Sequence, residues 1–225
     1  MSYDMLIQAN GINIFYEKAG EGRPFILLHG NGEDHSIFQE LAHALSKEYC
    51  VYSPDTRCHG KSASTPKLSY SDMAEDVAAF ITALKLEKPL LLGFSDGGIT
   101  GLLLAIKYPE MLSGLIACGA NTQPSQIKKW FLTIIKLQYI FNKDPKLRLM
   151  LTEPDISAQE LNSIKTPTLL LAGERDIVKT SATKRIAASV PNSELIILKG
   201  QTHSSYIMNH SRVLSAVQPF LSGMR

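Results

Sequence analysis

The sequence predicts an α/β protein in which helices cover both faces of a doubly wound, mostly parallel sheet. Six short runs are apolar at consecutive positions, which is typical of strands buried on both faces. Segments with helical periodicity lie between them, and this alternation favours a parallel sheet with right-handed crossovers. With 225 residues, 44% of them hydrophobic, the chain is long enough for a single domain over residues 1–225 with its own core. The predicted strands are residues 25–28, 50–52, 90–92, 115–118, 168–172 and 195–198.

The chain begins with a predicted antiparallel hairpin. Apolar segments at residues 6–9 and 12–16 flank Asn10 and Gly11, a pair that readily adopts the positive φ angles of a two-residue turn. Further along, apolar residues recur at intervals of three and four, which is the spacing of one helix face. Helices are therefore expected through residues 38–45, 73–84, 102–106 and 213–217.

Residues 121–163 interrupt the alternation because they contain no strand-like run. Apolar residues at helical spacing give this segment a wide apolar face, and Pro145 and Pro154 divide it. Ser157 followed by Glu160 matches a capping box at the start of a last short helix. We therefore expect a short helical lid over residues 121–163. Its apolar face consists of Ile127, Trp130, Phe131, Ile134, Ile135 and Leu137.

The composition excludes several classes of protein. The 23 Lys and Arg residues against 21 Asp and Glu residues give a net charge of +2, which offers no global attraction for nucleic acid. No apolar run approaches the roughly 18 residues of a membrane span, and residues 1–8 lack the features of a secretion signal. Three cysteines, an odd number, fit a reducing compartment. We expect a cytoplasmic monomer or homodimer that binds no nucleic acid and does not insert stably into a membrane.

The segment 93–98, Gly-Phe-Ser-Asp-Gly-Gly, lies between a predicted strand and a predicted helix. A strand that turns sharply into a helix holds a serine in a strained and exposed position, and small residues two before and two after it let the turn close. The helix N-terminus adds positive partial charge beside Ser95, and the backbone N–H of Asp96 can donate to a developing oxyanion. Ser95 is therefore the candidate nucleophile.

A serine nucleophile needs a base and an acid that orients the base. Asp176 and His203 each follow a predicted strand, so the three residues occur in the order Ser, Asp, His that is typical of a nucleophile elbow. The segment 29–32, His-Gly-Asn-Gly, follows the first apolar strand, and the backbone N–H of Asn31 is a natural second oxyanion donor. Because ligands of open α/β sheets bind at the carboxyl ends of the strands, these groups are expected to meet there.

Five segments together resemble the α/β-hydrolase fold superfamily over most of the chain, most closely its small bacterial hydrolases with a Ser-Asp-Gly-Gly elbow. The resemblance implies that Ser95 is the nucleophile, His203 the general base and acid, and Asp176 the acid that orients it. It also implies an oxyanion hole formed by the backbone N–H groups of Asn31 and Asp96. The serine disfavours the haloalkane dehalogenase and epoxide hydrolase branches, which attack with a carboxylate. The segments are 29–32, 55–62 (Asp-Thr-Arg-Cys-His-Gly-Lys-Ser), 93–98, 173–176 (Gly-Glu-Arg-Asp) and 200–203 (Gly-Gln-Thr-His).

The sequence departs from this superfamily in two places. Cys58 stands where members usually carry glycine, so the turn after Asp55 is expected to bend differently. The lid is short, so the pocket is expected to be shallow or open. Asp55 and Arg57 are expected to form a structural ion pair beneath the site.

These residues predict a serine hydrolase, without cofactor or metal, that cleaves a carboxylic ester through an acyl-enzyme, with a thioester or amide as the less favoured bond. The substrate is expected to be a small-molecule ester of small or medium size and apolar. Phe94, Trp130, Phe131 and Ile134 are expected to bind it. Two alternatives stay open: carbon–carbon bond hydrolysis or lyase chemistry on the same triad, and a ligand-sensing protein that turns over slowly or not at all.

The predicted lid is strongly basic. Residues 126–148 contain six Lys and Arg residues, and Asp144 is the only acidic residue among them, which gives a net charge of +5. Three interpretations account for this charge: a solvated outer face, attraction of an anionic substrate, and weak contact of a basic amphipathic helix with a membrane surface.

Overall fold

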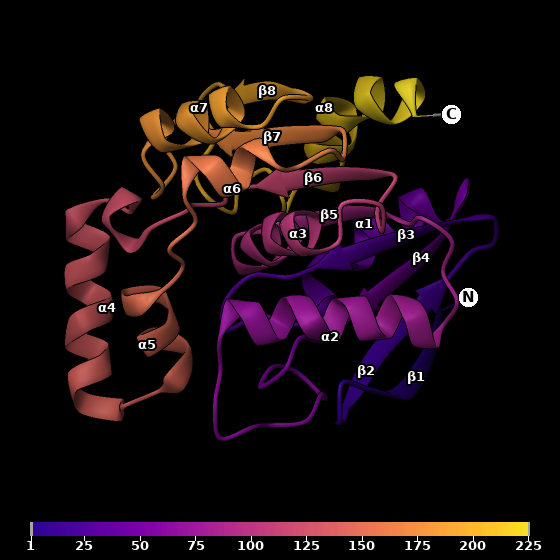
Figure 1. The fold of residues 1–225 in the computed structure, drawn as a ribbon, viewed down its shortest axis with the longest axis horizontal. Helices are drawn as coiled ribbons and strands as arrows, with labels where there is room; N and C mark the ends of the chain where they lie inside the picture. Colours follow the sequence, from indigo (N-terminus) through magenta and orange to yellow (C-terminus); the bar gives the residue numbers. More distant parts are fainter. Residues whose placement is uncertain (1, 225) are drawn as a thin grey trace.

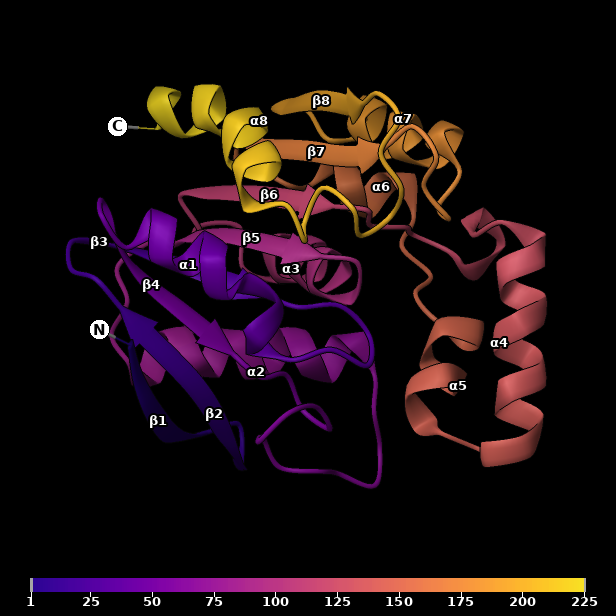
Figure 2. The same ribbon diagram turned by 180° about the vertical axis from the view of Figure 1, so that it is seen from behind.

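The computed structural model describes residues 2–224, which form one eight-stranded sheet with helices on both faces (Figures 1 and 2). The strand order is β1-β2-β4-β3-β5-β6-β7-β8. The first two strands pair antiparallel, β2 is antiparallel to β4, and the remaining pairs are parallel. The predicted fold class is confirmed. The strands are β1 Ser2–Ala9, β2 Ile12–Ala19, β3 Arg23–Leu28, β4 Tyr49–Pro54, β5 Leu90–Phe94, β6 Gly114–Cys118, β7 Thr168–Gly173 and β8 Ser193–Leu198.

The predicted N-terminal hairpin is present with the expected turn. Asn10 and Gly11 have φ angles of 49° and 76°, and Ala9 pairs with Ile12 across the turn. Such left-handed angles at both central positions match the right-handed twist of the two strands, which is why the Asn-Gly pair specifies this turn.

The helices form two layers, one on each face of the sheet. Helices α2, α3, α6 and α7 pack into one apolar cluster and α1 and α8 into the other, as Figures 1 and 2 show from opposite sides. The helices are α1 Gln39–Leu45, α2 Tyr70–Ala83, α3 Asp96–Lys107, α4 Lys129–Asn142, α5 Pro145–Thr152, α6 Ala158–Asn162, α7 Thr180–Ser189 and α8 His210–Gly223, with short 3-10 turns at His35–Phe38 and Pro124–Gln126.

The central strands are buried on both faces. In β3, Ile26 and Leu28 join one apolar cluster, while Phe25 and Leu27 join the other. Because successive side chains of a strand point to opposite faces, a strand between two helix layers must be apolar at every position. This explains why the strands appear in the sequence as unbroken apolar runs.

Within residues 121–163, α4 and α5 lie side by side beyond one end of the sheet (Figures 1 and 2). The predicted capping box is present at the start of α6, where the Ser157 side chain accepts from the Glu160 N–H and the Glu160 side chain accepts from the Ser157 N–H. Helix α6 itself contacts α3 and α7 on the sheet. We use the word lid from here on for α4 and α5, residues 129–152.

None of the helices in residues 2–224 has the length and apolar character that a membrane span requires.

Candidate active site

Ser95 stands at a sharp turn between β5 and α3. Its φ and ψ angles are 52° and −111°, a left-handed conformation that a side chain makes costly. The flanking glycines make the turn possible, because a Cβ at Gly93 would lie 2.1 Å from the Gly97 carbonyl oxygen. A Cβ at Gly97 would in turn lie 2.2 Å from the carbonyl oxygen of Leu28. The turn therefore needs glycine at both positions, as the motif predicts.

The structure brings the three candidate catalytic side chains together. The His203 Nε2 lies 3.0 Å from the Ser95 Oγ, and its Nδ1 lies 2.6 Å from the Asp176 Oδ1. Asp176 is 1% exposed, and its Oδ1 also accepts from the Val178 N–H. A carboxylate accepts only, so the Nδ1 carries the proton and the Nε2 facing the serine is free to take one. This geometry lets the imidazole deprotonate the hydroxyl as it attacks.

A glycine that sequence analysis did not single out makes room for the imidazole. Gly119, the residue after β6, has a φ of 62°, and a Cβ there would lie 2.8 Å from the His203 Cε1. Its N–H donates to the Leu171 carbonyl of β7. The end of β6 is therefore part of the site, although it contributes no side chain.

The loop after β3 lies against the start of α3. The Gly97 N–H donates to the His29 carbonyl at 3.1 Å, and the Asn31 side chain donates to the Asp96 Oδ2 at 2.8 Å. Within residues 2–224, the backbone N–H groups of Asn31 and Asp96 donate to no other protein group. Both N–H groups predicted as oxyanion donors are thus on neighbouring segments and available to a ligand.

The side chain of Asp96 connects the loop after β3 to α2. Its carboxylate is buried and accepts hydrogen bonds from the Tyr70 hydroxyl and the Asn31 amide, both at 2.8 Å. Burial raises the pKa of Asp96, and the two hydrogen bonds oppose that shift. The Asn31 amide also donates to the Lys146 carbonyl of α5 at 3.2 Å, so the loop is tied to the lid.

A cavity of about 620 Å³ opens beside Ser95 and His203. Phe94, Trp130 and Phe131, which the sequence suggested as substrate-binding residues, line this cavity. Ile134 does not line it, because this side chain lies on the outer face of α4 and is 44% exposed. The next residue, Ile135, is buried and lines the cavity instead, since one step along a helix turns the side chain by about 100°. The other lining residues are Gly30, Asn31, Gly32, Glu33, Asp144, Lys146, Leu147, Met150, Arg175, Ile177, Thr202 and Ser204.

Comparison with known proteins shows the family of this chain. The family model described as "alpha/beta hydrolase fold" matches residues 23–157, more than half of the chain. The chain belongs to this family.

Two curated relatives of the chain have names that describe an activity. A "Putative esterase/lipase" of Haemophilus influenzae is 26% identical, covering 88% of this chain and 82% of its own. "Serine hydrolase BPHL" of Mus musculus is 25% identical, covering 96% and 85%. Among solved structures, a meta-cleavage product hydrolase from Pseudomonas fluorescens IP01 aligns with a TM-score of 0.84 at 21% identity, over 98% of both chains, and this likeness concerns the fold.

In segment 55–62 of this α/β hydrolase, the ion pair predicted between Asp55 and Arg57 is wrong. Asp55 and Arg57 do not pair with each other: Arg57 forms a bidentate ion pair with Asp76 of α2. Asp55 instead accepts from the backbone N–H groups of His35 and Lys61. The two side chains have different partners, so the ion pair that was expected between them is absent.

Cys58 adopts a φ of 64°, the left-handed region that glycine favours. The backbone therefore accepts a side chain in a strained conformation at the position where family members usually carry glycine.

Asp34, His35 and Asp55 are the one group in residues 2–224 whose ligand atoms lie close enough together to hold a metal ion. These atoms already have protein partners. The Asp55 Oδ1 lies 2.7 Å from the His35 Nδ1, and the Asp34 side chain accepts from the Ser36 N–H. The group is therefore satisfied as a structural link between a loop and the sheet.

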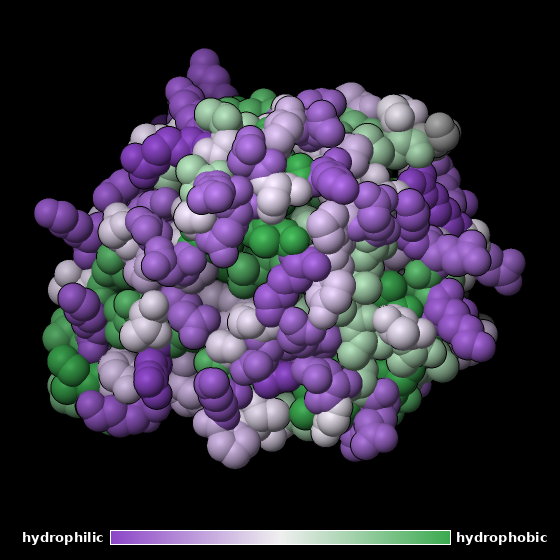
Figure 3. All heavy atoms as spheres, viewed as in Figure 1, coloured by the Kyte–Doolittle hydropathy of each residue, from purple (hydrophilic) through white to green (hydrophobic). Residues whose placement is uncertain are grey.

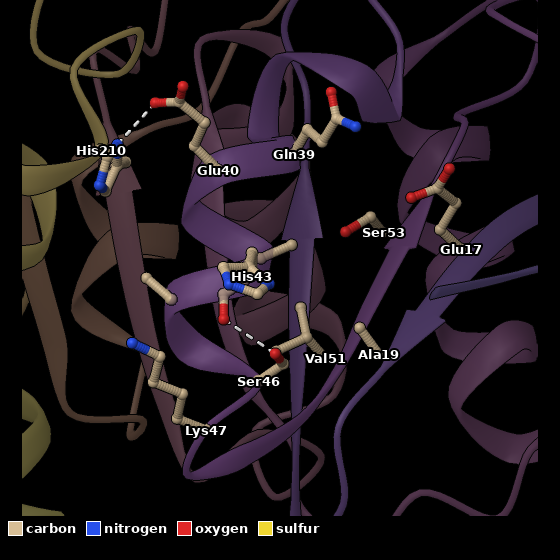
Figure 4. A pocket seen from close by; sticks show the side chains of 12 residues that line it. Glu17, Ala19, Gln39, Glu40, His43, Ser46, Lys47, Val51, Ser53 and His210 are labelled. Atoms are coloured by element: carbon tan, nitrogen blue, oxygen red, sulfur yellow. Dashed lines mark hydrogen bonds and ion pairs between the residues drawn. The ribbon is translucent and has the colours of Figure 1, made fainter. Parts of the chain in front are cut away.

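A second cavity of about 620 Å³ lies between α1 and the strands β2 and β4, and shares no lining residue with the first (Figure 4). Two of its lining residues, His210 and Glu40, form a hydrogen bond of 2.6 Å through the His210 Nδ1. Ser46 and Ser53 also line it, and the Ser46 hydroxyl donates to the His43 carbonyl.

Proposed function

We propose that this α/β hydrolase is a serine hydrolase that cleaves a carboxylic ester of a small or medium apolar substrate through an acyl-enzyme. The observation that carries the proposal is the chain of contacts from Ser95 to His203 and on to Asp176, at 3.0 and 2.6 Å. Relatives named as an esterase/lipase and a serine hydrolase support it.

In the proposed reaction the Ser95 hydroxyl adds to the ester carbonyl while the His203 Nε2 takes its proton. The carbonyl oxygen becomes an oxyanion that accepts hydrogen bonds from the N–H groups of Asn31 and Asp96. As the bond to the alcohol breaks, His203 gives the proton to the departing oxygen and the acyl-enzyme remains. Water then adds to the acyl-enzyme with His203 as base, and the carboxylic acid and the free serine are released.

Asp176 acts through His203 in this scheme. Its carboxylate holds the Nδ1–H tautomer and stabilises the imidazolium that forms during each proton transfer. Because Asp176 is held by the Val178 N–H as well, its orientation does not depend on the histidine.

The cavity wall supports the proposed substrate class. Phe94, Trp130, Phe131 and Ile135 present an apolar surface beside the serine, which suits an acyl chain or another apolar group. Glu33, Lys146 and Arg175 line other parts of the cavity. A large, fully apolar ligand would displace water from these polar side chains without replacing its hydrogen bonds, which is unfavourable.

The test is hydrolysis of p-nitrophenyl butyrate by matched variants. Ser95→Ala should lower turnover by at least about 10⁴-fold and Asp176→Asn by a similar order, with folding intact. Ser181→Ala, at an exposed serine of α7, is the control. A fluorophosphonate probe should label Ser95 alone. Full turnover by the Ser95 variant, or labelling of another residue, would overturn the proposal.

Two alternatives remain predictions and have distinct outcomes. A ligand-sensing protein would keep the cavity but fail to react with the fluorophosphonate. A carbon–carbon hydrolase would react with the probe and cleave a vinylogous diketone faster than any ester in a panel graded by acyl length.

A further inference from the structure

Helix α4 carries an exposed row of large apolar side chains. Trp130, Ile134, Leu137 and Phe141 follow one another at intervals of four, three and four, so they lie on one face of the helix. Leu137 is 52% exposed and Phe141 is 86% exposed. We call these four residues the apolar row. Figure 3 shows hydrophobic side chains along the edge of the molecule where Figure 1 places α4. Within residues 2–224, no other protein segment covers this face.

A row of lysines lies beside the apolar row. Lys129 and Lys136 are seven residues apart in α4, an interval that returns to nearly the same side of a helix, and Lys143 directly follows the last residue of α4; all three are exposed. We call them the basic row. Neither α4 nor α5 contains an acidic residue, and Asp144 between them caps α5 through the Lys146 N–H. The outer surface of the lid is therefore apolar and cationic, without compensating negative charge.

This combination selects the kind of partner that fits. Large apolar side chains beside lysines are the pattern of a helix that lies in the surface of an anionic bilayer. A second copy of this chain would bring two basic rows together, and the like charges would repel. With 14 residues, α4 is about 21 Å long, well short of a hydrocarbon core of about 30 Å, so it can lie on a bilayer but not cross it.

We propose that α4 docks this hydrolase reversibly on an anionic lipid surface, with the apolar row entering the bilayer and the basic row meeting the headgroups. The helix is placed to do so, because α4 and α5 stand beyond one end of the sheet and α4 forms the outer edge of the molecule (Figures 1 and 2).

The docking face connects with the candidate active site. Trp130 belongs to the apolar row and also lines the cavity beside Ser95, and it packs edge to face on Phe131 in the cavity wall. Docking would therefore place the cavity next to the lipid phase. Resting on the proposed function, this extension names the substrate class: acyl esters that partition into a lipid surface.

The binding experiment uses the natural fluorescence of the protein, because Trp130 is the single tryptophan. Vesicles of phosphatidylglycerol and phosphatidylcholine should shift its emission to the blue. Vesicles of phosphatidylcholine alone should bind at least about tenfold more weakly, and about 0.5 M salt should weaken binding to the anionic vesicles similarly. Equal binding to both vesicle types, or no shift with either, would overturn the proposal.

Variants locate the surface while keeping the tryptophan. K129Q/K136Q/K143Q should weaken binding to anionic vesicles on the order of a hundredfold, since each lysine contributes about tenfold or less. K67Q/K184Q/K199Q removes the same charge at exposed lysines elsewhere and should change binding by only a few fold. L137Q/F141Q should abolish the blue shift. Equal losses in the two lysine variants would overturn the assignment of the surface.

Two further measurements separate this proposal from its rivals. If sedimentation shows a dimer that L137Q/F141Q converts to a monomer, the apolar row is a self-association face and the docking proposal is wrong. Vesicle binding and turnover of a water-soluble ester are measured independently. Turnover without vesicle binding would overturn docking alone, whereas vesicle binding without turnover would overturn the proposed hydrolase function alone.

Discussion

Replacing His29 by glutamine should remove a sensitivity to acid that the wild-type protein has. His29 is fully buried in the loop after β3, where its Nε2 accepts from the Thr56 N–H at 3.0 Å. The Nδ1 therefore carries the proton and donates to the Gly30 carbonyl at 2.8 Å. Protonating the Nε2 would point a second N–H at the Thr56 N–H and bury a charge. Burial accordingly lowers the pKa of His29 from 6.5 to about 4.

The size and sign of the effect follow from this pKa. As the pH falls below 6.5, the unfolded chain gains a proton at His29 that the folded protein does not take up until about pH 4. Stability from this residue is therefore complete above the ordinary pKa and is lost as the solution becomes more acidic. Between pH 7 and pH 5 the loss is roughly 2 kcal/mol of the free energy of unfolding.

Urea unfolding at the two pH values measures this loss. The wild type should lose roughly 2 kcal/mol more than His29→Gln between pH 7 and pH 5, whatever the difference between the two proteins at pH 7. His43→Gln, at an exposed histidine of α1, should keep the wild-type dependence. If His29→Gln and the wild type lost the same amount, the assigned tautomer and the buried neutral state of His29 would be wrong.

Two other substitutions test the site. Gly119→Ala should lower kcat on the order of 10²-fold, because its Cβ would displace the His203 ring. Gly11→Ala is the control, because Gly11 has a similar positive φ but no atom within 4 Å. This variant should keep the wild-type kcat and lose only roughly 1–2 kcal/mol of stability by urea unfolding. If Gly119→Ala were as active as the wild type, the His203 imidazole would tolerate the added methyl group and the reasoning would be wrong. The Glu33 side chain accepts from the Gly30 N–H, and burial raises the pKa of Glu33 because it disfavours the charged carboxylate. The wild type should therefore lose free energy of unfolding relative to Glu33→Gln as the pH rises from about 3 to 7 and Glu33 ionises. A constant difference across that range would contradict the burial argument.

The strands could be predicted because burial on both faces leaves a simple signal. Helix α7 was not predicted, although it covers the sheet between β7 and β8. Its buried side chains are Ala182, Thr183 and Ile186, and two of these three are too small or too polar to register as an apolar stripe. A helix that approaches a sheet closely through small residues gives little periodicity in the sequence, even though its packing is close.

The site residues divide in the same way. Ser95, Asp176 and His203 could be predicted from sequence because each follows a strand, and the parallel sheet brings strand ends together. The difference between Ile134 and Ile135 could not, since both lie on an apolar helix and only the packing of α4 decides which one faces the cavity. Gly119 also escaped notice, because its contribution is the space that it leaves for an imidazole 84 positions later in the chain.

The hydrogen bonds of Asn31 connect the loop after β3 to residues outside its own sequence motif. Its amide bridges the Asp96 carboxylate at the elbow and the Lys146 carbonyl of the lid. Displacing the lid would remove the Lys146 carbonyl and leave the Asn31 amide with the Asp96 carboxylate as its partner. The loop that carries Asn31, the proposed oxyanion donor, therefore contacts the lid on one side and Tyr70 through Asp96 on the other. The Asn31 side chain is therefore the contact through which a change in the position of α5 would act on the loop after β3.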